Sequence, residues 1–169
     1  DLIDKAYELD FQDIGFTTAE PFESQKEILG ARKEEYAKIH RNMEMIKGAD
    51  PKNALPTAKS IVVLMNGYFR KSFPPVMEAH FGRCYQDDDR IPRVDLSKRV
   101  KAFRSYLRDN GIDSKIPGNL PDRLSAARAG VGTFGKNNFF YSNKFGAQSS
   151  WVNPINLVVD QEFEPDEPT

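Results

Sequence analysis

The chain has 169 residues, which is the length of one domain with a sizeable hydrophobic core. Its net charge of −1 and pI near 6.2 exclude a general attraction to nucleic acid or to an acidic membrane surface. The one cysteine, Cys84, excludes an internal disulfide framework and a cysteine-based metal site, and it favours a reducing, cytoplasmic environment. The apolar runs of the chain fall short of the roughly 18 residues that a membrane span needs.

Two helices and one strand are predicted in the first third of the chain. Apolar side chains recur at helical spacing over residues 2–9, which predicts a short helix. Phe11–Thr17 alternates loosely in polarity and predicts a brief strand. Glu20–Lys47 keeps helical spacing and predicts a longer helix, although Gly30 weakens its continuity, and Gly48 supplies a stop.

The strongest strand prediction is Ser60–Met65, which is almost entirely apolar. Such a run is typical of a central strand buried on both faces. Tyr68–Arg93 has three prolines and no clear period, which favours a long irregular lid or binding loop. Its acidic run Asp87–Asp89 is interpreted as a solvated patch rather than a metal site. The histidines His40 and His80 have no partner at ligand spacing and are interpreted as surface residues.

The second half of the chain predicts a clear helix that Asp95 caps and Asn110–Gly111 ends. Pro154, inside the last predicted strand, indicates a bulge or an edge position. Interleaved helices and proline-broken strands favour an α+β fold, a sheet covered by helices, over a doubly wound parallel sheet. The remaining elements predicted here are a strand at Ile112–Ile116, a helix at Leu124–Ala129, and strands at Asn138–Tyr141 and Trp151–Val159.

The C-terminal segment Asp160–Thr169 differs in composition from the rest of the chain. It has five acidic residues, two prolines and no basic residue. Such a composition predicts a linker that leaves the domain.

Three of the eleven glycines, Gly130, Gly132 and Gly135, have the spacing G-x-G-x-x-G. A dinucleotide-binding turn of this spacing follows a strand and precedes a helix. Here helix formers precede the glycines and aromatic residues follow them, so the dinucleotide interpretation is rejected. Gly130 fits the left-handed position after a helix, and the other two glycines allow a tight reversal.

Positive charge accompanies this glycine segment. No acidic residue occurs between Arg123 and Val159, whereas Arg128, Lys136 and Lys144 lie there. Free backbone N–H groups beside cations suit an anion, typically a phosphate. A helix cap and turn flanked by solvated lysines explains the same residues, so both interpretations stay open.

Several segments together carry a family likeness. They are Glu8–Thr17, then Asn53–Pro56 leading into the strand of Ile61, and a closing Val159–Asp160. The sharpest is Ala129–Asn137, A-G-V-G-T-F-G-K-N. On these residues the chain resembles the N-terminal cobalamin-binding domain shared by epoxyqueuosine reductases and reductive dehalogenases, which carries A-G-L-G-x-x-G-[KR]-[NH].

This resemblance implies a nitroreductase-like sandwich around a mostly antiparallel sheet, with a base-off cobalamin in a pocket lined by the glycine turn. Residues 1–159 would form this domain, and residues 160–169 would lead to a missing ferredoxin-like domain with two [4Fe–4S] clusters. An electron donor such as ferredoxin or flavodoxin is implied, and a homodimer stays open. The implied cofactor-binding residues are Arg128, Ala129, Gly130, Val131, Gly132, Thr133, Phe134, Gly135, Lys136 and Asn137.

The chain also departs from the family pattern. Epoxyqueuosine reductases carry a catalytic aspartate in a V-D-S-A-P-type turn, whose place falls near Ile116–Pro117 here, and Asp113 is offset from it. The turn before Asn119 is closer to the dehalogenase pattern. By this resemblance Asn119 would hydrogen-bond the substrate, Lys136 would orient or neutralise an anion, and Tyr85 would donate the proton.

The function implied by the resemblance is cobalamin-dependent reduction of a small-molecule or tRNA-borne substrate, with electrons from iron–sulfur clusters outside the chain. Two alternatives stay open. A cobalamin-binding or trafficking protein without its own substrate would account for the missing aspartate. A flavin-dependent nitroreductase-like protein would share the fold, and a phosphate-binding loop suits FMN.

Overall fold

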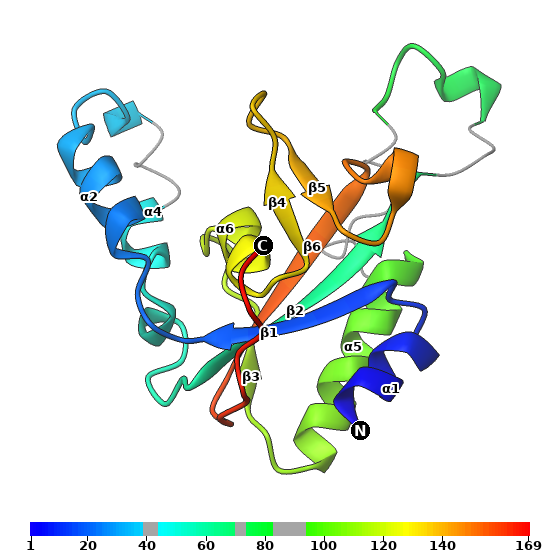
Figure 1. Cartoon of the computed structure of the whole chain (residues 1–169), viewed down its shortest axis with the longest axis horizontal. Helices are drawn as coiled ribbons and strands as arrows, with labels where there is room; N and C mark the ends of the chain where they lie inside the picture. The colour runs from blue at the N-terminus through cyan, green and yellow to red at the C-terminus, as the bar shows by residue number, and fades with distance from the viewer. Residues whose placement is uncertain (39–43, 70–73, 83–93) are drawn as a thin grey trace.

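The computed structural model describes residues 1–38, 44–69, 74–82 and 94–169. Within these residues a four-stranded sheet has the order β1–β2–β6–β3, and every pairing in it is antiparallel. Helices lie on both faces of the sheet (Figure 1), which confirms an α+β fold with an antiparallel sheet. The strands are β1 (Asp13–Thr18), β2 (Ser60–Gly67), β3 (Ser114–Lys115) and β6 (Val152–Val159).

The predicted central strand is confirmed. β2 pairs with β1 on one side and with β6 on the other. The side chains from Ile61 to Met65 are 0% exposed, because both faces of the strand are covered. Val62 and Leu64 face one hydrophobic cluster, whereas Ile61, Val63 and Met65 face the other.

Each face of the sheet has its own covering layer. The helices α1 (Leu2–Glu8) and α5 (Asp95–Asp109) contribute to the cluster on one face. The helix α6 (Asp122–Arg128) and a separate two-stranded hairpin of β4 (Gly132–Phe134) and β5 (Phe140–Ser142) contribute to the cluster on the other.

Two helix predictions are wrong in detail. The long helix predicted over Glu20–Lys47 is interrupted: α2 (Glu23–Ala31) ends soon after Gly30, and α4 (Met45–Gly48) starts separately. Leu29 is the one buried side chain of α2, so helical spacing had little apolar contact to sustain a longer helix. His40 and part of this stretch, 39–43, lie outside the described residues.

The start of α5 also differs from the prediction. Val94 is the N-cap, and it makes no side-chain cap hydrogen bond. Asp95 lies in the first turn instead, where its carboxylate accepts a hydrogen bond from Arg99 at 2.9 Å. A carboxylate at this position still favours the positive end of the helix dipole.

Pro154 lies on an edge-exposed part of β6, which confirms the edge position, one of the two alternatives predicted for it. The pairing of β6 with β2 runs without a break through Pro154, which lies opposite Met65. β3 reaches only Val158 and Val159. Over the described residues the rest of β6 therefore has a strand on one side only, so a residue without an N–H group is tolerated there.

The acidic C-terminal segment stays on the domain over the described residues: it crosses β1 at Phe16 and ends beside the turn after α6 (Figure 1). The ring of Phe163 packs on Phe16 with centroids 5.2 Å apart. The Phe16 N–H donates to the Asp166 carboxylate at 2.7 Å, and the Asp166 N–H donates back to the Phe16 carbonyl at 2.9 Å. The segment thus covers the unpaired edge of the sheet, and its role as a connection to a further domain stays a prediction.

The remaining predictions concern a membrane span, the residues of the long loop and the histidines. In the part of the chain that the structure describes, no helix is both long enough and apolar enough to cross a membrane. Cys84, Tyr85 and Asp87–Asp89 fall in 83–93, outside the described residues, so the predictions on them are not examined by this structure. His80 is exposed, as predicted.

Candidate functional site

The glycine segment forms the turn after α6 and then the first strand of the hairpin. α6 ends at Arg128, Gly130 takes the left-handed conformation with φ +67°, and β4 starts at Gly132. This helix, turn and strand order confirms the reason for rejecting a dinucleotide fingerprint. The chain reverses later than predicted, between Gly135 and Phe139. The Gly135 N–H donates to the Phe139 carbonyl at 2.9 Å, and the Asn138 N–H donates to the Gly135 carbonyl at 2.9 Å.

The chain itself requires two of the glycines. A Cβ on Gly130 would overlap the carbonyl oxygen of Glu167 in the C-terminal segment, and its positive φ disfavours other residues. A Cβ on Gly132 would overlap the carbonyl oxygen of Tyr141 in β5. The close approach that these glycines permit is therefore an approach of the protein's own backbone.

The first part of the motif faces inward. Ala129 and Val131 are buried in the cluster beneath α6. Their side chains stabilise the packing of the turn on the sheet, since each removes apolar surface from water. Neither side chain is available to a ligand.

Arg128 also supports the fold. Its guanidinium donates to the Thr17 hydroxyl at 3.1 Å and to the carbonyl oxygens of Thr18 and Glu20 at 2.7 and 3.1 Å. The same group lies 3.8 Å from the centroid of the Phe22 ring. Burial lowers the pKa of Arg128, against an opposing effect of the Glu20 charge. The guanidinium thus fastens α6 to the end of β1.

The second part of the motif faces outward. Thr133, Lys136 and Asn137 are exposed, and Phe139 next to them is 58% exposed. The Asn137 amide donates to the Tyr141 hydroxyl at 2.9 Å, and its oxygen accepts from the Phe139 N–H at 3.2 Å. Phe134 packs edge-on against Phe140, with centroids 5.7 Å apart. The hairpin thereby presents a hydroxyl, a cation and an aromatic ring on a turn that its own side chains hold in shape.

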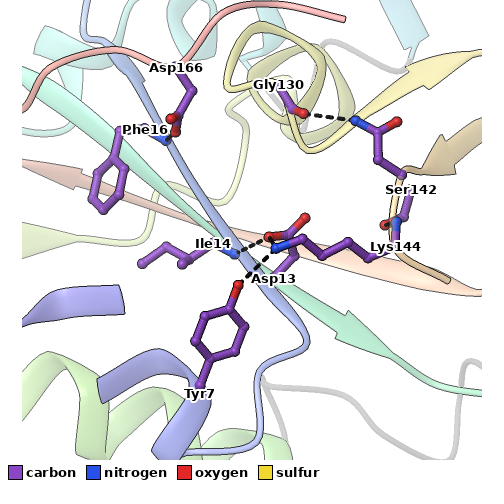
Figure 2. A network of polar contacts seen from close by, with 9 residues as sticks. Tyr7, Asp13, Ile14, Phe16, Gly130, Ser142, Lys144 and Asp166 are labelled. Atoms are coloured by element: carbon purple, nitrogen blue, oxygen red, sulfur yellow. Dashed lines mark hydrogen bonds and ion pairs between the residues drawn. The ribbon is translucent and has the colours of Figure 1, made fainter. Parts of the chain in front are cut away.

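A partly buried ion pair joins Lys144, just after β5, to Asp13 at the start of β1 (Figure 2). The Lys144 ammonium lies 2.6 Å from the carboxylate of Asp13, whose side chain is only 6% exposed. The ammonium also contacts the Tyr7 hydroxyl at 2.8 Å. The hydrogen bond to Asp13 is the largest cause of a raised pKa for Lys144, and Tyr7 adds to it. Lys144 is therefore held in its charged form.

The neighbours of Lys144 extend this attachment to the glycine turn. The Asn143 amide donates to the Gly130 carbonyl at 2.9 Å, and the Asn143 N–H donates to the Val131 carbonyl at 3.2 Å. The hairpin is thus fixed at its base to α6 and to the sheet. Apart from the absence of acids near Lys144, no sequence pattern predicts the Asp13–Lys144 pair, because the partners are 131 residues apart.

The predicted catalytic residues do not share one described cluster. Asn119 donates from its amide to the Glu44 carbonyl at 3.1 Å and packs closely on Gly48 of α4. Lys136 lies on the exposed hairpin turn, and Tyr85 is outside the described residues. No contact in the described part of the chain joins Asn119 to the hairpin.

The carboxylates near the missing aspartate already have partners. Ile116, near which the resemblance predicts that aspartate, is 36% exposed. Asp113 accepts the Ser114 N–H at 2.8 Å, and Asp122 accepts the Asn156 amide at 2.7 Å. Among the described residues no group of three or more His, Cys, Asp or Glu side chains could hold a metal ion.

The relatives and most of the solved structures that resemble this chain are epoxyqueuosine reductases. No family model matches the sequence. An epoxyqueuosine reductase of Staphylococcus aureus is 35% identical over 178 residues, which cover 99% of this chain and 46% of that protein. A structure of epoxyqueuosine reductase from Bacillus subtilis matches 99% of this chain and 46% of its own with TM-score 0.77 and 29% identity. Over 99% of its length the chain is therefore similar to about half of an epoxyqueuosine reductase, which confirms the predicted resemblance to this family.

Two further structures extend the comparison. An epoxyqueuosine reductase crystallised with an epoxyqueuosine-modified tRNA stem loop has TM-score 0.73 at 25% identity, over 99% of this chain and 46% of that one. A reductive dehalogenase has TM-score 0.63 at 13% identity, over 99% of this chain and 20% of that one, and so shares the fold. The chain spans about half the length of the epoxyqueuosine reductases it matches.

Proposed function

We propose that the chain is the cobalamin-binding part of a reductase that acts on a tRNA-borne substrate. The observation that carries this proposal is the similarity to an epoxyqueuosine reductase over 99% of the chain at 35% identity. A structurally similar enzyme binds a modified tRNA stem loop. In this proposal residues 1–159 form a nitroreductase-like domain, and residues 160–169 lead toward a ferredoxin-like domain with [4Fe–4S] clusters that supply electrons.

The exposed hairpin residues fit a cofactor of this kind. Cobalamin carries many amide groups and one phosphodiester, so it needs hydrogen-bond donors, a cation and an apolar surface. The hairpin offers the Thr133 hydroxyl, the Lys136 ammonium and the exposed ring of Phe139. No acidic residue occurs between Arg123 and Val159 in the sequence, so the acids that lie beside the glycine turn are those of the C-terminal segment, Asp166 and Glu167.

Within this proposal the cofactor supplies low-potential cobalt chemistry, and the protein supplies orientation and a proton. Lys136 would pair with the anionic group, and Thr133 and Asn137 would donate hydrogen bonds. Tyr85 would deliver the proton to the reduced carbon, because the described carboxylates Asp113 and Asp122 are already engaged.

A second candidate function is favoured by Ile116. A family member without its catalytic aspartate could bind cobalamin without reducing a substrate. Turnover of the whole protein distinguishes epoxyqueuosine reduction from cobalamin binding alone. The protein is incubated with a reductant and a modified tRNA stem loop, and the modified nucleoside is followed by mass spectrometry. Conversion supports the reductase, and cobalamin binding without conversion of this or a halogenated substrate supports the carrier.

Cofactor binding is tested on the 169-residue chain by visible absorbance during titration with cobalamin, and in parallel with FMN. We expect the cobalamin spectrum to shift to its base-off form and FMN to remain unbound. Lys136→Gln should weaken cobalamin binding, whereas Lys33→Gln, which removes an exposed lysine beyond α2, should not. FMN binding with no cobalamin binding would replace the proposal by the flavin alternative.

A further inference from the structure

An open cavity of about 640 Å³ lies away from the glycine hairpin, between the C-terminal half of α5 and β3. Figure 1 shows these two elements at the end of the sheet opposite the hairpin tip. The cavity is lined by Lys101, Arg104, Ser105, Arg108, Gly111, Ile112, Asp113 and Ser114. None of the residues assigned to cobalamin is among them.

Three cations share one face of α5 and line this cavity. Lys101, Arg104 and Arg108 are separated by three and four residues, so they follow one another along the helix. Their backbone positions span about 10 Å, from seven residues at a rise of about 1.5 Å. In the described part of the chain none of the three forms an ion pair with a carboxylate.

The two arginines of the cavity, Arg104 and Arg108, donate hydrogen bonds to uncharged partners. Arg104 donates to the Ser114 carbonyl at 3.0 Å and to the Ser114 hydroxyl at 3.3 Å. Arg108 donates to the Ser105 hydroxyl at 2.8 Å. These contacts orient the guanidinium groups without neutralising their charge, and each group keeps further N–H donors.

One carboxylate lines the same cavity. The Asp113 side chain accepts the Ser114 N–H at 2.8 Å, which turns one of its oxygens to the backbone. Three cations against one carboxylate leave the cavity positive in a chain whose net charge is −1. The positive charge is therefore local, and it selects an anion at this place rather than attracting polyanions over the whole surface.

We propose that this cavity binds backbone phosphates of an RNA strand. Guanidinium and ammonium groups are the usual partners of phosphate oxygens. A nucleic-acid strand presents about three charges along 10 Å of its axis, which matches the length of the row of cations. The choice of RNA rests on the proposed function, whereas the phosphate chemistry rests on the cavity alone.

The test measures binding of a fluorescently labelled tRNA stem loop to the 169-residue chain by anisotropy, over about 0.05 to 0.3 M salt. We compare the wild type with Lys101→Gln/Arg108→Gln, in which both changed residues are exposed, and with the control Lys33→Gln/Lys52→Gln, which removes two exposed lysines elsewhere. Each lost phosphate contact should reduce the slope of log K against log salt by about 0.7 to 0.9. Two lost contacts should weaken binding roughly 30-fold at about 0.1 M salt.

The outcomes separate this proposal from the proposed function. Modified and unmodified stem loops should bind alike and lose the same affinity in the double variant, because phosphates carry no sequence information. Unchanged affinity in the double variant, or no RNA binding by the wild type, overturns the proposal whatever the cofactor assay shows. A calorimetric titration with inorganic phosphate that detects binding lost in the double variant, without RNA binding, would reassign the cavity to a small phosphorylated ligand.

Discussion

Replacing Lys144 by methionine tests the partly buried ion pair that fastens the hairpin to the sheet. The substitution keeps most of the apolar stem of the side chain but removes its charge. It leaves the Asp13 carboxylate, 6% exposed, with the Ile14 N–H at 2.9 Å as its remaining described donor. Breaking a fully buried pair typically costs about 3–5 kcal/mol. Lys144 is itself 52% exposed, so water can replace part of the lost contact, and we expect a cost of about 1–3 kcal/mol.

The assay is urea unfolding of the 169-residue chain, followed by circular dichroism. For a domain of this size each kcal/mol corresponds to about 2–4 °C in the midpoint of thermal unfolding, so a scan gives an independent measurement. Lys136→Met is the matched control, since Lys136 is an exposed lysine on the same hairpin. It should change the free energy of unfolding by less than about 0.5 kcal/mol.

A double-mutant cycle with Asp13→Asn isolates the pair from other effects of each change. The coupling energy should account for most of the loss in Lys144→Met. Equal stabilities of the Lys144→Met and Lys136→Met variants, or no coupling to Asp13, would show that the contact is too well solvated to matter and would refute the reasoning.

Three further predictions concern the pH dependence of the Lys144–Asp13 pair, the contact of Asp166 with β1, and the role of Tyr85. The raised pKa of Lys144 means that its pair with Asp13 stabilises the fold fully below the ordinary lysine pKa of 10.5 and stops doing so as pH rises through the raised value. The stability difference between the wild type and Lys144→Met should therefore stay constant below pH 10.5 and shrink above it, which unfolding at a series of alkaline pH values would show. Asp166→Ala should cost about 1–2 kcal/mol and increase hydrogen exchange at Phe16, because the β1 edge loses a charged acceptor at 2.7 Å; equal exchange would contradict this. Tyr85→Phe should leave cobalamin affinity unchanged and cut turnover of the whole protein about 10²- to 10⁴-fold, and full turnover would reject Tyr85 as the proton donor.

The sequence predicted best those elements whose residues report directly on their surroundings. Ser60–Met65 is apolar at every position but the first. A continuous apolar run of this kind is typical of a strand that is covered on both faces, as β2 is. Gly130 was placed correctly because a left-handed residue after a helix favours glycine. The long helix over Glu20–Lys47 was wrong because periodicity reports an amphipathic face but not whether a partner surface covers it.

The site was less predictable because its contacts join distant segments. The Asp13–Lys144 pair, the stacking of Arg128 on Phe22 and the contact of Asp166 with Phe16 of β1 all depend on tertiary structure. The composition of the C-terminal segment favoured a linker, yet Phe163 alone gives it an apolar anchor on the sheet. One aromatic side chain in an acidic segment is too weak a signal to predict docking.

The split of the glycine motif decides which variants can test cofactor binding. A substitution such as Gly132→Val would force the new side chain against the Tyr141 carbonyl and the Phe140 ring, so it should distort the hairpin before any ligand is considered. Loss of cobalamin binding in that variant would therefore follow from either interpretation of the motif. Thr133 and Lys136 are exposed, and no contact in the described part of the chain depends on either side chain, so changing them leaves the hairpin intact. Weaker cobalamin binding in Thr133→Ala and Lys136→Gln, with unchanged unfolding midpoints, would assign the outward part of the motif to the cofactor. Unchanged binding in both would leave the motif with a purely structural role.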